Sequence, residues 1–269
     1  MTMPTTMPSQ RATAQEMEQY REEGFFVREA VFREEELQPL RDGVDEIHRR
    51  IVKAASDPDA EPARLVDGKR YQSLLGSSVQ WEWREGADEL RTMEPYHHLD
   101  ARLDALIDDI RLWGPARDIV AAEELSLFSD KLNFKRPNGC PFPWHQDNPY
   151  WAFLCDHLDR LVSVGLALDD SNRANGCLWV IPGSHKQGAL PCFEDRGVVG
   201  RLYTDLSQQG LGEPLALEVP AGSVMYFDGD IVHGSQTNRS SDHRRALLMT
   251  YQPAGLPRWQ HEDVRPIVG

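Results

Sequence analysis

The run Pro143-Trp144-His145-Gln146-Asp147-Asn148 places an imidazole and a carboxylate two positions apart in a stretch with extended character. Side chains at positions i and i+2 of a strand share a face, so His145 and Asp147 could converge on one ion. A second histidine, His233, follows 88 residues later (233 − 145). Two histidines and one carboxylate form the facial triad that holds non-haem Fe(II). An antiparallel jelly roll is a fold that brings such distant strands together.

His145 and Asp147 are one of several His-x-Asp pairs in this sequence. Three further pairs occur at His98-Asp100, His157-Asp159 and His261-Asp263. The first falls in a helical pattern, where residues i and i+2 point roughly 200° apart. The second lies in a charged connection, and the third has no later histidine to complete a triad. The setting of His145-Asp147 is the suitable one, although the pair alone is also compatible with a surface histidine beside a turn aspartate.

The composition describes a chain that can bury a large core. It has 269 residues, of which 40% are hydrophobic and 27% charged, and its mean hydropathy is −0.53. No stretch approaches the about twenty consecutive apolar residues of a membrane-spanning helix. The net charge of −14 argues against nucleic acid or anionic membranes as partners. The oligomeric state does not follow from these features.

The N-terminus and the cysteines favour a cytoplasmic protein. Residues 1–12 are polar and rich in Pro and Thr, without the apolar segment of a secretory signal, and are predicted to be a disordered lead-in. The four cysteines show no Cys-x-x-Cys spacing, which gives no support to a zinc ribbon or a redox dithiol. We therefore expect reduced thiols.

The first part of the chain, residues 13–122, is predicted to be mainly helical. Thr13 and Glu16 have the spacing of a capping box, and apolar residues three and four apart mark an amphipathic helix further on. The predicted elements are a helix from Thr13 to Gly24, a short strand over Phe25–Val27, a helix over Glu34–Ala55, a polar loop over Asp57–Gly68, helical segments around Tyr71–Trp83 that could form a lid, and a helix over Leu99–Leu112.

From Glu123 onward, short β-type runs alternate with turn residues. The predicted strands are Leu125–Phe134, Leu161–Leu168, Cys177–Ile181, Leu215–Val219, Val224–Phe227 and Arg245–Tyr251. Many short strands with turn signals predict a sandwich or barrel. No flexible linker divides the two parts. The sequence therefore predicts a mainly β fold with N-terminal helices, in one domain over residues 13–269 with its β core over 123–255.

Basic and polar residues near two of these strands could bind an anion. Lys131, Asn133 and Lys135 alternate with apolar residues and would share one strand face, which is either solvent-exposed or turned toward a bound anion. Arg244 and Arg245 begin the last strand, and adjacent strand residues face opposite sides. One of the two arginines therefore faces the cavity, where a guanidinium could bind a carboxylate through two parallel hydrogen bonds.

Several of these pieces together resemble the phytanoyl-CoA dioxygenase family of Fe(II)/2-oxoglutarate-dependent oxygenases, from Thr13 to about Tyr251. The matching stretches are Leu132-Asn133-Phe134-Lys135, Trp144-His145-Gln146-Asp147, Asn175-Gly176-Cys177-Leu178-Trp179-Val180-Ile181-Pro182-Gly183-Ser184-His185, and His233-Gly234-Ser235 followed by Asn238 through Arg244. The N-terminal run Gln15–Val27 also fits the opening helix and strand of the family.

The resemblance implies a double-stranded β-helix, or jelly roll, and a set of site residues. It assigns His145, Asp147 and His233 to the iron. It assigns Arg244 to the far carboxylate of 2-oxoglutarate, with Ser235, Lys135 and Asn133 as further contacts of this co-substrate. O₂ takes the remaining iron position, 2-oxoglutarate becomes succinate and CO₂, and a C–H bond of a small-molecule substrate is hydroxylated. His185 is assigned to a structural turn.

The substrate and the outcome of the oxidation stay open at this point. Family members often carry Trp near Gly165, so this glycine leaves space in the pocket. Asn148–Trp151 is expected to line the substrate mouth, and a small polar metabolite or natural-product intermediate is the expected ligand. Asp147 favours hydroxylation over halogenation, whereas desaturation or cyclisation would use the same triad. One alternative is a non-catalytic jelly-roll binding protein, which has no need of the triad and Arg244 together. The other is a zinc hydrolase, which would not need Arg244.

Overall fold

The computed structural model describes residues 10–193, 197–200, 202–207 and 210–268. The first nine residues of the predicted lead-in lie outside this part of the chain. Its last positions are described, and there the Arg11 guanidinium and the Ala12 N–H both donate hydrogen bonds to the Asp118 carboxylate.

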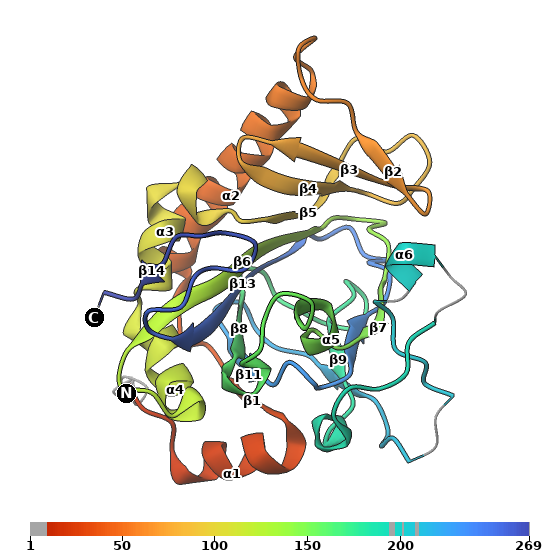
Figure 1. Ribbon diagram of the computed structural model, residues 1–269. Coiled ribbons are helices and arrows are strands. Elements are labelled where there is room, and N and C mark those ends of the chain that lie inside the picture. The colour runs from red at the N-terminus through yellow and green to blue at the C-terminus, as the bar shows by residue number, and fades with distance from the viewer. Residues whose placement is uncertain (1–9, 194–196, 201, 208–209, 269) are drawn as a thin grey trace, which may run out of the picture.

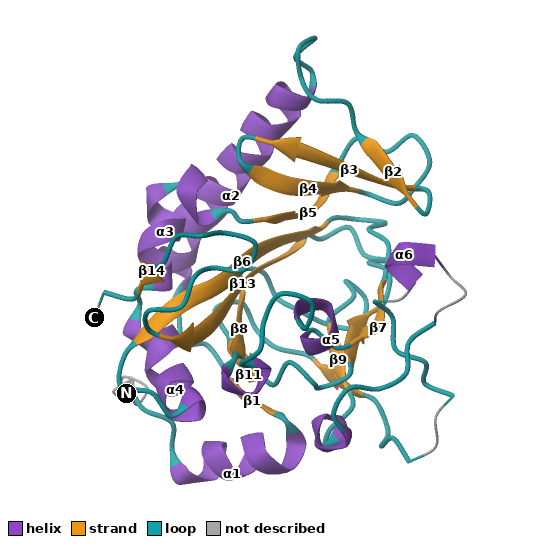
Figure 2. Ribbon diagram, in the orientation of Figure 1, coloured by secondary structure: helices purple, strands orange, loops and turns teal. Residues whose placement is uncertain are grey.

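Eight strands form two facing antiparallel sheets, which Figure 2 shows in orange. The chain passes between the sheets repeatedly, so that the large sheet has the order β11-β8-β13-β6 at its centre and the small sheet the order β10-β9-β12-β7. This arrangement confirms the predicted jelly roll. The strands are β6 (Leu125–Lys135), β7 (Phe142–His145), β8 (Val162–Ala167), β9 (Leu178–Val180), β10 (Leu215–Leu217), β11 (Val224–Phe227), β12 (His233–Ser235) and β13 (Arg244–Pro253).

The large sheet extends beyond the jelly roll at both edges. Strand β1 (Phe25–Arg28) pairs with β11, and β14 (Arg265–Pro266) pairs with β6. A meander continues on the other side of β6 through β5 (Leu90–Glu94), β4 (Ser77–Trp81), β3 (Lys69–Leu74) and β2 (Arg64–Val66).

The meander corrects two predictions, namely the loop over Asp57–Gly68 and the helical segments around Tyr71–Trp83. Part of the predicted loop is β2, and the predicted lid is the β3–β4 hairpin. The two central turn residues, Leu75 and Gly76, have φ of 51° and 80°, as a type I′ hairpin turn requires. Leu at the first of these positions is not a usual turn residue, so the sequence did not reveal the hairpin.

The N-terminal helices form largely where the spacing predicts them. Helix α1 (Ala14–Glu23) has the capping box of Thr13 and Glu16 and ends at Gly24 with φ of 84°. Helix α2 spans Glu34–Ala55.

The predicted helix over Leu99–Leu112 is wrong in its extent, because the segment contains two helices. They are α3 (Ala101–Ile107) and α4 (Ile110–Val120), and each starts at an aspartate, Asp100 or Asp109, whose side chain accepts from the backbone N–H two residues on. The shorter helices are α5 (Asn148–Trp151), α6 (Gly197–Gly200) and the 3₁₀ turns η1 (His97–Leu99), η2 (Leu158–Arg160) and η3 (Ser184–Gln187).

The two faces of the large sheet have different environments. Figure 1 shows α2, α3 and α4 on one side of this sheet and the small sheet on the other. Leu132 and Phe134 of β6 are fully buried in one hydrophobic core with Val44 and Ile47 of α2. Because strand residues alternate, Lys131 of β6 faces the cavity between the sheets. The helices thus cover the apolar face, and the polar face is left to line a site.

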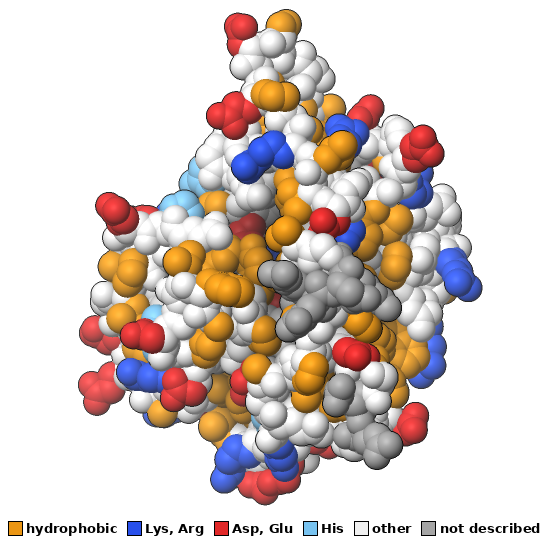
Figure 3. Space-filling model, turned by 45° about the vertical axis from the view of Figure 1, so that its right-hand side comes forward, with side chains coloured by type: hydrophobic (Ala, Val, Ile, Leu, Met, Phe, Trp, Pro, Cys, Tyr) orange, Lys and Arg blue, Asp and Glu red, His pale blue; other side chains and the backbone are white. Residues whose placement is uncertain are grey.

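The surface is charged mainly along the outline of the face shown in Figure 3, where acidic and basic side chains alternate and hydrophobic ones gather nearer the middle. Within the described part of the chain, no helix combines the length and the apolar character that crossing a bilayer would require.

Candidate active site

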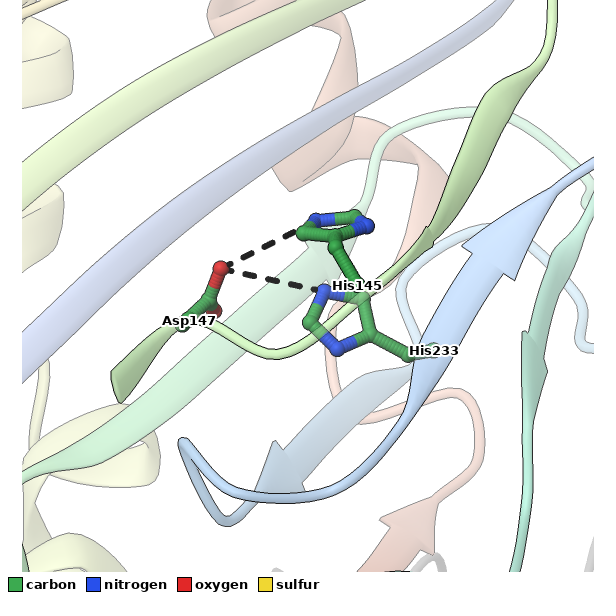
Figure 4. Close-up of side chains that lie close together, drawn as sticks. All are labelled: His145, Asp147 and His233. Atoms are coloured by element: carbon green, nitrogen blue, oxygen red, sulfur yellow. Dashed lines mark ion pairs between the residues drawn. The ribbon is translucent and has the colours of Figure 1, made fainter. Parts of the chain in front are cut away.

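Pairing of β7 with β12 brings the two predicted histidines together. His233 lies directly opposite His145 in the antiparallel register, and their ring centroids are 4.1 Å apart. Asp147 follows β7, and its Oδ1 lies 3.8 Å from His145 Nε2 and 3.9 Å from His233 Nε2 (Figure 4). Three side chains that are distant in sequence therefore converge at one point between the sheets.

Both imidazole rings are oriented by the backbone. His145 Nδ1 lies 2.7 Å from the Pro143 carbonyl oxygen, and His233 Nδ1 lies 3.0 Å from that of Ile231. A protonated Nδ1 donates to each carbonyl, which leaves the Nε2 lone pair directed toward Asp147. Burial, with the neighbouring His233, lowers the pKa of His145 to about 3. Its ring is thus neutral and able to bind a metal at physiological pH.

The chain around Asp147 is also fixed by backbone contacts. The N–H groups of Asp147 and Asn148 both donate to the Gly229 carbonyl at 2.9 Å. A Cβ at Gly229 would lie 2.1 Å from Asn148 Oδ1, so any larger residue here would displace the buried Asn148 side chain. Gln146 points the other way and donates to the carbonyls of Gly188 and Asp230. The alternation predicted for His145 and Asp147 is therefore present.

The three side chains meet the requirements of a divalent iron site. One ligand atom from each of His145, Asp147 and His233 lies within 4.8 Å of the others, and they form the single such group of His, Cys, Asp or Glu side chains among the described residues. Metal–N and metal–O bonds of about 2.0–2.2 Å place neighbouring ligand atoms about 3 Å apart, so a metal would draw these atoms together by about 1–2 Å. Two imidazoles and one carboxylate, all from one side, match the donor set of the facial triad.

The other His-x-Asp pairs and His185 make different contacts. His98 Nε2 lies 2.9 Å from the Leu75 carbonyl, and His157 Nε2 lies 3.0 Å from Gln252 Oε1. His185, in η3, contacts the Arg21 carbonyl at 3.2 Å.

A cavity of about 900 Å³ lies beside the triad, between the two sheets. Apolar side chains from both sheets line it, among them Phe142, Met225, Phe227 and Leu248. Tyr150 and Trp151 of α5 also line it, as predicted for the stretch after the His-x-Asp pair. The cavity thus combines an apolar lining with the three side chains of the triad at its edge.

Arg244 lines this cavity, and its side chain is nearly enclosed. The residue is 7% exposed, and its guanidinium makes neither a hydrogen bond nor an ion pair with any described residue. Burial lowers its pKa to about 10, and the thiol of Cys177 and the carboxylate of Asp169 act on it only at longer range. A buried guanidinium without a partner is costly, which indicates an anionic ligand.

Arg245 faces the opposite side of β13. It donates to both carboxylate oxygens of Asp169, at 2.8 and 3.0 Å, and to Asp45 at 3.1 Å. The geometry thus separates the two arginines that the sequence left undecided.

Lys135, Ser235 and Asn133 lie around the Arg244 end of the cavity. Lys135 pairs with Arg244 in the ladder, is 2% exposed, and donates from Nζ to Ser235 Oγ at 2.6 Å and to the Gln236 carbonyl at 2.5 Å. Ser235 and Asn133 line the cavity, whereas Lys135 reaches it through Ser235. The Asn133 Oδ1 is buried and has no hydrogen-bond partner among the described residues.

Some residues of the cavity were not found from the sequence. Glu94, at the end of β5, accepts a hydrogen bond from Ser129 Oγ, and burial raises the pKa of its carboxyl. Ser163 of β8 lines the cavity and contacts the Thr250 hydroxyl at 3.2 Å. The alternation Ser129, Lys131, Asn133 on β6 was the available signal, but the strand that carries Glu94 was not recognised.

Comparison with known proteins places the chain in a family. A family model described as "Phytanoyl-CoA dioxygenase (PhyH)" matches residues 20–246. The chain belongs to this family. Its membership confirms the predicted class, the Fe(II)/2-oxoglutarate-dependent oxygenases.

Curated relatives span most of the chain. A protein of Stutzerimonas stutzeri named "Probable alpha-ketoglutarate-dependent hypophosphite dioxygenase" is 28% identical over 263 residues, which cover 95% of this chain and 81% of the relative. The ectoine dioxygenase of Bordetella parapertussis is 28% identical, and the match covers 89% of this chain and 75% of the relative. The phytanoyl-CoA dioxygenase of Arabidopsis thaliana is 26% identical, with coverage of 93% and 92%.

Solved structures share the fold at lower identity. EctD from S. alaskensis, solved with 2-oxoglutarate and 5-hydroxyectoine, superposes with a TM-score of 0.69 at 21% identity and covers 97% of this chain and 87% of its own. The carbocyclase SnoK from nogalamycin biosynthesis gives a TM-score of 0.68 at 20% identity, with coverage of 99% and 100%.

Proposed function

We propose that this oxygenase binds Fe(II) through His145, Asp147 and His233 and hydroxylates a small polar molecule with 2-oxoglutarate as co-substrate. The convergence of three ligand atoms from β7, its following turn and β12 carries the proposal. The Arg244 guanidinium, which has no partner among the described residues of the same cavity, supports it. A zinc hydrolase would not need this guanidinium, and a binding protein would not need the triad together with it.

Iron in this site would supply oxygen activation coupled to decarboxylation of 2-oxoglutarate, with succinate and CO₂ as products. The backbone carbonyls of Pro143 and Ile231 hold each Nδ1 proton and so keep each Nε2 free for the metal. Asp147 contributes one negative charge and leaves other positions open for the co-substrate and O₂. The same residue favours hydroxylation over halogenation.

Arg244 would bind the far carboxylate of 2-oxoglutarate. Its planar fork can donate two parallel hydrogen bonds, which are strong where water is excluded. Ser235, held by Lys135 at 2.6 Å, and the amide of Asn133 would be further partners of the same ligand. The apolar side chains of Phe142 and Phe227 would cover the aliphatic part of the co-substrate and exclude water.

Several other features belong to this proposal. We infer one domain over residues 13–269, with the jelly roll at 123–255, because helices and sheet share a single large hydrophobic core. A cytoplasmic location agrees with Cys140, Cys155, Cys177 and Cys192 all being free thiols. The names of the relatives point to small substrates such as ectoine, L-proline and 2-aminoethylphosphonate.

The test uses the purified protein under anaerobic conditions. Adding Fe(II) and then 2-oxoglutarate should produce a visible charge-transfer band, which Zn(II) cannot give. Exposure to O₂ should then release succinate. A protein that binds Fe(II) but gives no band with 2-oxoglutarate would contradict the proposal. A protein that gives the band but releases no succinate with any of a wide range of candidate substrates would be a binding protein, which would also contradict the proposal.

A further inference from the structure

Glu94 and Lys131 are oppositely charged neighbours on adjacent strands, and the side chains of both face the cavity. The β5–β6 register joins Thr92 to Asn133 and Met93 to Leu132, and its continuation places Glu94 opposite Lys131. Residues opposite one another on antiparallel strands have Cβ atoms about 4.5–5.5 Å apart. Both side chains line the cavity beside the triad.

These opposite charges do not pair with each other. Glu94 accepts instead from Ser129 Oγ, although Lys131 is near enough to influence the Glu94 carboxyl electrostatically. Lys131 Nζ makes no hydrogen bond or ion pair with any residue in the described part of the chain. One ammonium and one carboxylate therefore remain available to a ligand, side by side.

The pair lies away from the end of the cavity where Arg244 is found. Arg244 is opposite Lys135 at the end of β6, and Lys131 lies four residues earlier in the same strand. At a rise of about 3.4 Å per residue, the two levels are about 14 Å apart. Lys131 thus lies at the metal end of the cavity, where its charge also acts on His145, and not beside the carboxylate that Arg244 would bind.

A second lobe of the cavity opens next to this pair. Its volume is about 830 Å³, and it shares Glu94, Lys131, His145 and Asp147 with the first lobe. Polar side chains line it further out, and one of them, Thr92, has a buried hydroxyl with no hydrogen-bond partner among the described residues. The lobe is thus suited to a polar ligand that reaches the metal from the side opposite Arg244.

We propose that the substrate is a small zwitterion, whose cationic group binds Glu94 and whose anionic group binds Lys131. This inference rests on the proposed function and specifies its substrate class. A simple anion would satisfy Lys131 but would be repelled by Glu94, and a simple cation would meet the reverse situation. A ligand with both charges compensates both side chains, which then hold the intervening C–H bonds beside the metal site.

The experiment compares matched ligands on the enzyme loaded anaerobically with Fe(II) and 2-oxoglutarate. The panel contains small amino acids and aminophosphonates, each with an N-acetyl form that keeps only the anion and a carboxamide or phosphonate diester that keeps only the cation. At least one zwitterion should perturb the charge-transfer band and raise the melting temperature of the protein. Its singly charged forms should bind about 10- to 100-fold more weakly, as expected for loss of one charge-assisted contact.

Variants assign the effect to the two side chains. Glu94→Gln and Lys131→Met should each weaken zwitterion binding by about 10- to 100-fold and leave the 2-oxoglutarate titration unchanged. Glu89→Gln is the control, because the half-exposed Glu89 pairs with Arg84 and does not line the cavity. Glu94→Asp and Lys131→Arg, which keep the charges, should recover part of the affinity.

Three results would overturn the inference while the proposed function stands. The band could form normally with no zwitterion perturbing it, the singly charged forms could bind as tightly as the zwitterion, or Lys131→Met could impair 2-oxoglutarate binding as Arg244→Ala does. Failure of the band itself would instead refute the proposed function.

Discussion

The small sheet holds its functional side chains through the backbone, whereas the large sheet presents charged side chains directly to the cavity. On the small sheet, the carbonyls of Pro143 and Ile231 fix the two imidazoles, and Gly229 fixes the turn at Asp147. On the large sheet, Arg244 and Lys131 have no such partners among the described residues. The proposed metal site is therefore preorganised by the backbone, and the charged residues of the large sheet would determine which co-substrate and substrate bind.

This difference predicts that changes in the triad of the small sheet remove all activity, while changes in the charged residues of the large sheet affect one ligand at a time. Arg244 lies at one level of the β6–β13 ladder and Lys131 about 14 Å along it. Co-substrate and substrate affinities should accordingly respond to different residues.

The largest effect is expected for the metal ligands. His145→Ala or Asp147→Ala should abolish stoichiometric iron binding and lower turnover by more than about 100-fold, which is the most that loss of an outer partner of a metal ligand costs. The fold should persist, because both side chains face the cavity and not the core. Iron content, succinate release and circular dichroism measure these outcomes.

Matched controls come from the other His-x-Asp pairs. His261→Ala and Asp159→Ala alter exposed side chains of the same types, and both should keep iron and activity. Iron bound at full stoichiometry by the Asp147→Ala variant would show that the carboxylate is not a ligand.

The next largest effect separates Arg244 from Arg245. Arg244→Ala should raise the 2-oxoglutarate concentration needed for half-maximal activity by about 30-fold or more, since truncating one partner of a buried charge pair costs about 2–5 kcal/mol. Arg245→Ala should leave that concentration unchanged. It should instead lower the free energy of unfolding by about 1–3 kcal/mol, because the Asp169 carboxylate loses its two hydrogen bonds from the guanidinium. The reverse assignment of these two effects would mean that the cavity-facing arginine is Arg245.

The alternation of strand side chains explains why so much of this site could be predicted. His145 and Asp147 share a face with Gln146 on the other, and strand Val224–Phe227 has the predicted ends. Alternation also limited the co-substrate arginine to one of two neighbours. It could not decide between them, because facing depends on which partner strands lie beside β13.

The residues that escaped prediction depend on pairing between strands. Glu94 reaches the cavity only through the β5–β6 register, and β5 itself, Leu90–Glu94, has a mixed pattern that is not typical of a strand. Lys135 is among the expected co-substrate contacts, but its own hydrogen bonds to Ser235 and Gln236 do not follow from its sequence pattern. The segments that meet at Glu94 and at Lys135 are 35 to 101 residues apart, and local sequence does not specify such contacts.

A moderate and pH-dependent effect is expected at Lys135. Burial, with the charge of Arg244, lowers its pKa to about 6, while in the unfolded chain the pKa is near 10.5. The unfolded state therefore binds more protons between these values, so this lysine makes stability rise with pH from about 6 toward 10. Below pH 6 both states are protonated, and the cost of burying the ammonium is present in full.

Lys135→Met should remove this component of the pH dependence. Urea unfolding at pH 6, 7.5 and 9 should show a shallower rise for the variant than for the natural protein, and Lys53→Met, on the exposed face of α2, should show no change. The same variant should weaken 2-oxoglutarate binding less than Arg244→Ala does, because Lys135 reaches the ligand through Ser235. An unaltered pH slope would show that the pKa of Lys135 is the same in the folded and unfolded states, so that burial does not lower it.

The smallest effect is expected at Gly165, on the central strand β8 of the large sheet. A Cβ there would lie 3.4 Å from Met225 Cε and 4.0 Å from Phe227 Cε1, which are ordinary contacts with side chains, one of them flexible. Gly165→Ala should therefore stabilise the protein slightly, by up to about 1 kcal/mol through the unfolded state. Titrations of both ligands should change by less than about threefold, because the added methyl group enters unused space. A tenfold loss in the 2-oxoglutarate titration alone would instead show that the co-substrate occupies the room left by this glycine, and the boundary between the two ligands would then lie closer to Lys131 than the ladder register suggests.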